Sequence, residues 1–145
     1  MKPEIDQILN VSAMQLTTAL APQLPAGYAQ GSVSLIAFMM MLSAQEYDRA
    51  ADVRAAENAD MRALFGELAP HVKDSALQTR MEAASNTDDE SLRISALDAA
   101  NHELRKLLID AQTHIETLGA PEAEQKIWNV LRSSADRRVL KMPGS

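Results

Sequence analysis

The chain has 145 residues and a formal net charge of −6, and 46% of its residues are hydrophobic whereas only 3% are aromatic. This length suits one domain, with a core built from Leu, Ile, Val, Met and Ala. Because Ala loses no side-chain entropy in a helix, and sheets draw on β-branched and aromatic residues, the composition favours helices. The sequence contains no cysteine, which excludes disulfides, thiolate catalysis and cysteine-ligated metal centres.

The charge is unevenly distributed along the sequence. Residues 1–45 carry one basic and two acidic residues, residues 46–90 carry five and eleven, and residues 91–145 carry eight and seven. The acidic middle argues against a nucleic-acid partner, since phosphate binding relies on clustered Lys and Arg. Acids among the first ten residues, where a signal peptide has a basic run, lead us to expect a cytoplasmic protein. A basic cluster near the end is typical of a helix C-terminus: Arg132, Arg137, Arg138 and Lys141.

The first two helices are predicted over residues 3–21 and 28–65. Ile5, Leu9 and Leu16 recur at helical spacing in the first, and two prolines and a glycine follow it. The second is long for a domain of this size, and a break near Gly31 would shorten it. Its packing stripe is apolar at first and becomes polar farther along, in the order Ile36, Met40, Ser43, Tyr47, Arg54, Asn58, Met61 and Phe65.

The stretch VSLIAFMMML, residues 33–42, is the most apolar part of the chain. It is too short for a membrane span of about 20 residues and is followed by charged residues, so we expect no membrane partner. A helix that is apolar on every side is buried on every side. Three interpretations stay open: a monomer core, a self-association surface, or a pocket for an apolar ligand. The predicted interface residues are Leu35, Met39, Met40 and Leu42.

The remaining helices are predicted over residues 69–84, over residues 88–118 and from Pro121 onward. Thr87 and Glu90 have the spacing of a capping box, which predicts the start of the second of these. Gly119 suits the left-handed position that ends it. Its apolar stripe has one polar member, Asn101, among the members Ile94, Leu97, Ala100, Leu104, Leu108, Ala111, Ile115 and Leu118. The predicted fold is therefore all-α, an antiparallel bundle of four to five helices with two long ones, in a single domain 1–145.

A polar insert interrupts the packing faces of the two long helices. An arginine on a packing face needs a partner, and the nearest ones for Arg54 on its own helix are Glu57 and Asn58. Three interpretations stay open: this face emerges into water, forms a buried polar network, or lines a ligand pocket. The candidate ligand-binding residues are Tyr47, Arg54, Glu57, Asn58 and Asn101.

Metal ligation has one weak candidate. Asp110 and His114 are four residues apart and so share one face of a helix, but the pattern is also that of a surface ion pair. The Glu-x-x-His spacing of di-iron bundles does not occur at any histidine. We therefore expect no cofactor.

No phosphate-binding loop, nucleophile elbow or zinc-protease motif occurs in the sequence. The expected function is non-enzymatic: a helical bundle that acts through protein–protein interaction or self-association, with a homodimer as the expected state. The alternative is a bundle with a small internal polar site that binds a metal ion or a small anionic ligand.

Overall fold

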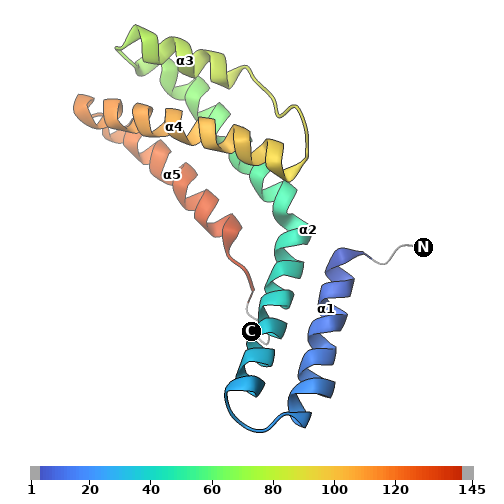
Figure 1. Cartoon of the computed structure of the whole chain (residues 1–145). Coiled ribbons are helices and arrows are strands. Elements are labelled where there is room, and N and C mark those ends of the chain that lie inside the picture. The colour runs from blue at the N-terminus through green and yellow to red at the C-terminus, as the bar shows by residue number, and fades with distance from the viewer. Residues whose placement is uncertain (1–3, 142–145) are drawn as a thin grey trace. The chain divides into compact units, whose positions relative to one another are not determined.

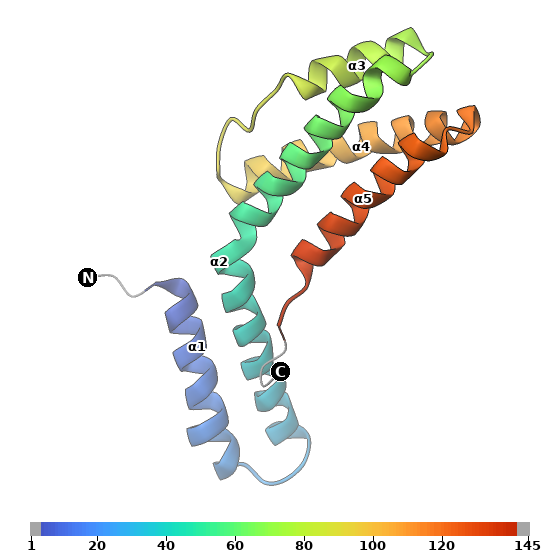
Figure 2. The same cartoon turned by 180° about the vertical axis from the view of Figure 1, so that it is seen from behind.

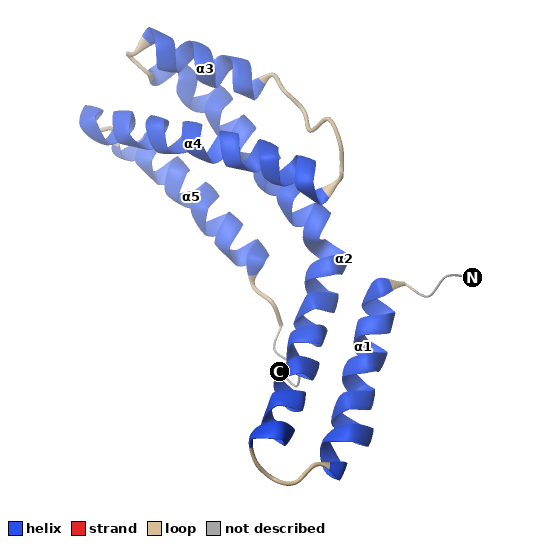
Figure 3. Cartoon of the chain, viewed as in Figure 1, coloured by secondary structure: helices blue, strands red, loops and turns tan. Residues whose placement is uncertain are grey.

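The computed structural model describes residues 4–141, which form helices joined by loops, with no strand in this range (Figure 3). The all-α prediction is confirmed, as are the two long helices, α2 with 41 residues and α4 with 25. The elements in chain order are α1 (Ile5–Gln15), a π-helix (Leu16–Leu20), a 3-10 turn (Ala21–Gln23), α2 (Tyr28–Leu68), a second 3-10 turn (Ala69–His71), α3 (Ser75–Ser85), α4 (Ile94–Leu118) and α5 (Pro121–Arg138).

Contacts between residues divide the described chain into two compact units. The first, here called the hairpin unit, contains the residues up to Ala50 together with Leu140 and Lys141. The second, here called the bundle unit, contains Ala51–Val139. Helix α2 contributes its first half to one unit and its second half to the other. The single domain predicted over residues 1–145 stays a prediction.

In the hairpin unit, α1 and the first half of α2 run antiparallel and side by side (Figures 1 and 2). The connection between them is held where Gln30 Nε2 donates to the Ala21 carbonyl at 3.2 Å. Near the other end of the unit, the side-chain amide of Gln45 binds both backbone groups of Lys141. Its Nε2 donates to the Lys141 carbonyl at 2.8 Å, and its Oε1 accepts from the Lys141 amide at 3.0 Å.

The bundle unit combines the second half of α2 with α3, α4 and α5 and has an apolar core that includes Phe65 and Ile115, both fully buried. Ion pairs join its helices at the surface, with Arg80 and Asp110 linking α3 to α4 at 2.8 Å. The buried stripe of α4 matches the middle of the predicted one, from Leu97 to Ile115, and includes Asn101, whereas Ile94 is exposed. Gly119 has φ of 60° and ends α4 in the left-handed conformation, as predicted. The core residues are Met61, Leu64, Phe65, Leu68, Ala69, Val72, Leu77, Met81, Leu104, Leu107, Leu108, Ala111, Ile115 and Ile127.

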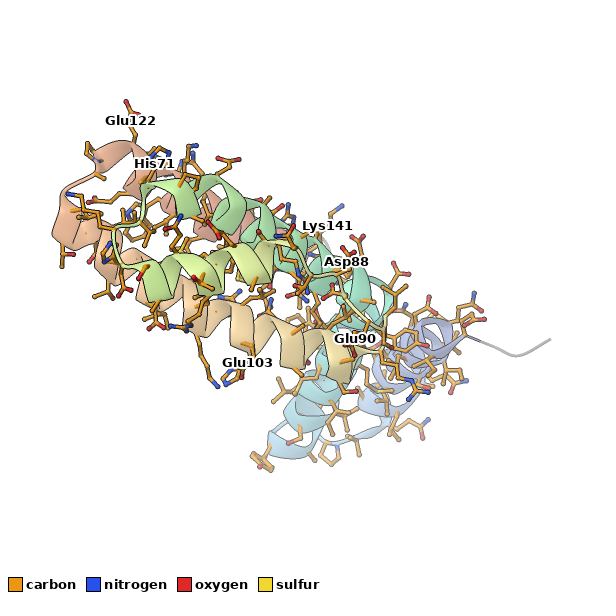
Figure 4. The ribbon with its side chains drawn as sticks, turned by 90° about the horizontal axis from the view of Figure 1, so that it is seen from above. His71, Asp88, Glu90, Glu103, Glu122 and Lys141 are labelled. Atoms are coloured by element: carbon orange, nitrogen blue, oxygen red, sulfur yellow. The ribbon has the colours of Figure 1, made fainter. Side chains whose placement is uncertain are left out.

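The predicted capping box at Thr87 and Glu90 is wrong, because α4 begins only at Ile94. The Thr87 hydroxyl instead donates to the Ala84 carbonyl at 2.7 Å and accepts from Arg62 at 3.0 Å. The loop between α3 and α4, on which Figure 4 labels Asp88 and Glu90, is thus bound to α2 by its side chains. Side-chain bonds to a neighbouring helix outweigh the local capping preference here.

Two other helix boundaries differ from the sequence prediction. The segment predicted as one helix over residues 69–84 contains a 3-10 turn and then α3, which starts after Asp74. The Asp74 carboxylate caps α3 by accepting from the amides of Ala76 and Leu77 at 2.9 and 3.1 Å. Helix α2, by contrast, continues past Gly31 without a break. None of the helices within residues 4–141 has the combined length and apolar character that crossing a bilayer requires.

Candidate functional site

A buried carboxylate, Glu57 on α2, is the centre of a polar network in the bundle unit. Its side chain is 2% exposed and accepts two hydrogen bonds from Arg138 on α5, at 2.6 and 2.7 Å. Ser134, also on α5, donates to it at 2.8 Å. From α4, Arg105 and Asn101 each donate to it at 3.2 Å. One anion on α2 therefore fixes the positions of α4 and α5.

A second buried polar residue, Asn58, extends the network toward the loop before α4. Its Nδ2 donates to Asp89 at 3.0 Å and to the Leu97 carbonyl at 3.2 Å, and its Oδ1 accepts from Asn101 at 2.9 Å. Asp89 also accepts from Arg62 at 2.8 Å. Within residues 4–141, every buried side-chain nitrogen and oxygen has a hydrogen-bond partner. The network is therefore complete without an added group.

The environment of Glu57 fixes its charge. Burial raises the pKa of this carboxyl, but hydrogen bonds from Arg138, Ser134 and Arg105, and the positive charge of Arg138, lower the pKa to about 2. A general acid or base works best when its pKa lies near the operating pH. Glu57 stays ionised at neutral pH, and so its chemistry is that of a fixed structural anion.

An open surface groove of about 480 Å³ lies next to this network, between α4 and α5. Arg105 and Arg138 line it, but both guanidinium groups also bind Glu57. At its edge Asp98 pairs with Arg54 at 2.6 Å. The groove is lined by Asp98, Asn101, His102, Arg105, Leu131, Ser134, Ala135 and Arg138.

The structure brings together three of the five predicted ligand-binding residues. Glu57, Asn58 and Asn101 form the buried network, the second of the three interpretations of the polar insert. Arg54 pairs with Asp98 on α4, whereas a partner on its own helix was expected. Tyr47 lies in the hairpin unit and is 45% exposed. Ligand binding by these residues stays a prediction.

Sequence reasoning missed the partners of Glu57 on the other helices. Arg138 was interpreted only as a cation near a helix C-terminus, and Ser134 was not singled out. Arg105 follows Asn101 by one helical turn and donates to its side chain at 2.8 Å. A polar residue on an apolar stripe with an arginine one turn later was the available signal for this pair.

The predicted metal ligands Asp110 and His114 bind other groups. Asp110 pairs with Arg80, and His114 Nε2 accepts from the Lys73 backbone amide at 3.2 Å. Within the described residues, no group of three or more His, Asp or Glu side chains is arranged to hold a metal ion. Metal binding at this pair stays a prediction with no further support.

The hairpin unit has a different kind of interior. Among residues 4–50, the buried side chains are all alanines, and the large apolar side chains remain partly or largely exposed. Alanine lets two helices approach closely but buries little apolar area. The buried residues are Ala13, Ala21, Ala37, Ala44 and Ala50. The exposed large apolar residues are Ile5, Ile8, Val11, Met14, Leu20, Tyr28, Leu35, Ile36, Met39 and Tyr47.

The surface of this unit is also unusually poor in charge, because no Asp, Glu, Lys or Arg occurs from Gln7 to Gln45. Of the predicted interface residues, Leu35 and Met39 are 58% and 59% exposed, and Met40 and Leu42 are half-buried. None of the three consecutive methionines is buried. The methionine run is therefore not fully buried, and the three interpretations of this stretch stay predictions.

The alanine contact can be tested by enlarging one of its members. Ala37 is 0% exposed, and we expect Ala37→Leu to separate α1 from α2 at a cost of about 1–3 kcal/mol, as is typical of overpacking. Amide hydrogen exchange should then be faster along α1, whereas the control Ala29→Leu, at an exposed position of the same helix, should leave exchange unchanged. Equal protection of α1 in both variants would contradict the alanine contact.

Comparisons with known proteins returned no match: no protein-family model, no curated protein and no solved structure corresponds to this chain.

Proposed function

We propose that the protein acts without catalysis, by association through the exposed apolar surface of its hairpin unit. In this proposal the bundle unit is the stable part of the protein to which that surface is attached. The observation on which the proposal rests is the contrast between the two interiors. The bundle unit buries Leu, Ile, Met and Phe side chains, whereas the buried side chains of the hairpin unit are alanines.

The energetics favour a covering partner. A large apolar side chain contributes about 1.5–3 kcal/mol when it is fully removed from water, and the exposed apolar side chains of the hairpin unit realise only about half of that contribution. Ile8 and Ile36 are still 47% and 52% exposed. Large exposed apolar patches on soluble proteins commonly mark sites of interaction.

The polar network supports a structural role for the bundle unit. Glu57 is bound by donors from two other helices, and its low pKa makes it unsuitable for proton transfer near neutral pH. Buried polar groups of this kind can fix the register of packed helices. The arrangement therefore supports a rigid body better than a reaction centre.

Site-specific photo-crosslinking in the cell tests the proposal. A photoreactive amino acid at position 36, replacing Ile36, should yield a discrete crosslinked product. The same group at position 34, replacing exposed Ser34 on the same helix, should yield much less. If neither position 36 nor position 39, which replaces the exposed Met39, gives a product, association through the hairpin unit is wrong.

A further inference from the structure

We infer that the partner of the hairpin unit is a second copy of the same chain, docked through one flank of the hairpin. This inference rests on the proposed function and specifies both the partner and the face that it covers.

The face consists of two apolar stripes. Counting about 100° per residue from Ala13 on α1, Leu16 and Ile8 fall roughly 60–140° to one side. Counting in the same way from Ala37 on α2, Met40 and Ile36 fall about 60–100° to the same side. Ala13 and Ala37, both buried, are the reference residues at which the two helices are taken to face each other. In antiparallel helices that face each other in this way, residues rotated in the same direction from the reference lie on the same flank of the pair. The two stripes therefore join into one continuous face, here called the apolar flank.

The opposite flank differs in chemistry. Its α1 side mixes the exposed polar residues Gln7 and Asn10 with the exposed Met14. Its α2 side carries half-buried Phe38 and Leu42, and Gln45, on the same helical stripe, holds the backbone of Lys141. Because part of this flank is polar and part binds the chain's own C-terminal segment, the apolar flank is the better docking surface.

Charge identifies the occupant. A partner that brought charged groups to the apolar flank would bury them without counter-charges, because residues 7–45 contain none. The occupant must therefore present an uncharged apolar surface. The apolar flank of a second copy meets this requirement, and two hairpins would then form a four-helix arrangement with a two-fold axis.

The area is adequate for a stable dimer. Ile5, Ile8, Ile36 and Tyr47 are 48%, 47%, 52% and 45% exposed. At roughly 150–200 Å² for a large side chain, these four residues expose on the order of 350 Å². A standard interface covers about 800 Å² on each partner and is roughly 65% apolar in homodimers. The four residues therefore supply much of the apolar part of such an interface, and the half-buried residues of the same stripes add to it.

Sedimentation velocity and native mass spectrometry of the full chain test the inference. The wild type should be a dimer at micromolar concentration. In the double variant Ile8→Glu/Ile36→Glu, the dissociation constant of the dimer should be at least 100-fold higher. The matched control Asn10→Glu/Ser34→Glu places the same charges on the same two helices, on the opposite flank, and should remain dimeric. Fluorescence of Trp128, the only tryptophan, should show an unchanged bundle unit in both variants.

A second measurement avoids loss of folding as an explanation. Because the sequence has no cysteine, Ile36→Cys introduces a single thiol on the apolar flank. Under mild oxidation it should give a disulfide-linked dimer much faster than Ser34→Cys.

Three outcomes would overturn the inference. They are a monomeric wild type at high micromolar concentration, equal dissociation of the test and control variants, and equal disulfide formation at positions 36 and 34. The proposed function fails separately. A monomer that still crosslinks in the cell to a different protein through position 36 leaves association through the hairpin intact and refutes only self-pairing.

Discussion

Replacement of Glu57 by alanine should destabilise the bundle unit by about 3 kcal/mol. Removing one partner of a buried ion pair typically costs about 3–5 kcal/mol, because the remaining charge has no counter-ion. The lower end of this range applies here, since the side chains of Arg105 and Arg138 are 39% and 48% exposed and water can solvate them in part. Urea unfolding followed by Trp128 fluorescence measures the change, because Trp128 lies on α5.

Asp60→Ala is the matched control for this experiment. Asp60 lies three residues after Glu57 on the same helix and pairs with Arg137 at 2.5 Å, but both side chains are 32% exposed. Exposed pairs contribute at most about 1 kcal/mol, so this variant should unfold close to the wild type. If the two variants lose equal stability, the network around Glu57 is no more important than a surface ion pair.

The sequence predicts the helices of this protein better than it predicts their contacts. The all-α class, the two long helices and the end of α4 at Gly119 follow from composition, periodicity and a glycine at the cap. These features depend on residues close together in the chain. The capping box at Thr87 failed because Arg62, 25 residues earlier in the chain, binds that threonine.

The polar network shows the same limit at the candidate site. Glu57, Asn58 and Asn101 could be singled out, because polar residues interrupt an apolar stripe. Their partners could not be, since Arg138 is 81 residues from Glu57 in the sequence and fits an ordinary helix C-terminus equally well. Pairing across that distance depends on how helices pack, which local patterns do not specify.

The hairpin unit shows a second reason for failure. Stripes with helical spacing on α1 and α2 were expected to be packing faces, because periodicity indicates that a face is buried but not by what. In the structure the buried positions of the two helices are alanines such as Ala13 and Ala37, and both lie outside the predicted stripes. The predicted packing faces are therefore wrong for this unit, because the pattern favours large apolar side chains and the buried positions are alanines.

Acid should reveal the contribution of Glu57 to stability through its pKa. The folded-state pKa of about 2 lies below the unperturbed value of 4.5, so folding favours the ionised form. The resulting stabilisation is fully present above about pH 4.5 and is lost as the pH falls toward 2. One unit of pKa difference corresponds to about 1.4 kcal/mol, and Glu57 should therefore account for a loss on the order of 3 kcal/mol across this window.

The measurement is a comparison of the wild type with Glu57→Gln, because other carboxyl groups also titrate in this range. The free energy of unfolding, measured by urea titration at several pH values between 5 and 2, should fall more steeply for the wild type. The two curves should converge near pH 2, because Glu57 of the wild type becomes protonated there and loses its charge. The glutamine of the variant is uncharged at every pH. Parallel curves would mean that Glu57 has an ordinary pKa, and the arginines of α4 and α5 would then not hold it as an ion.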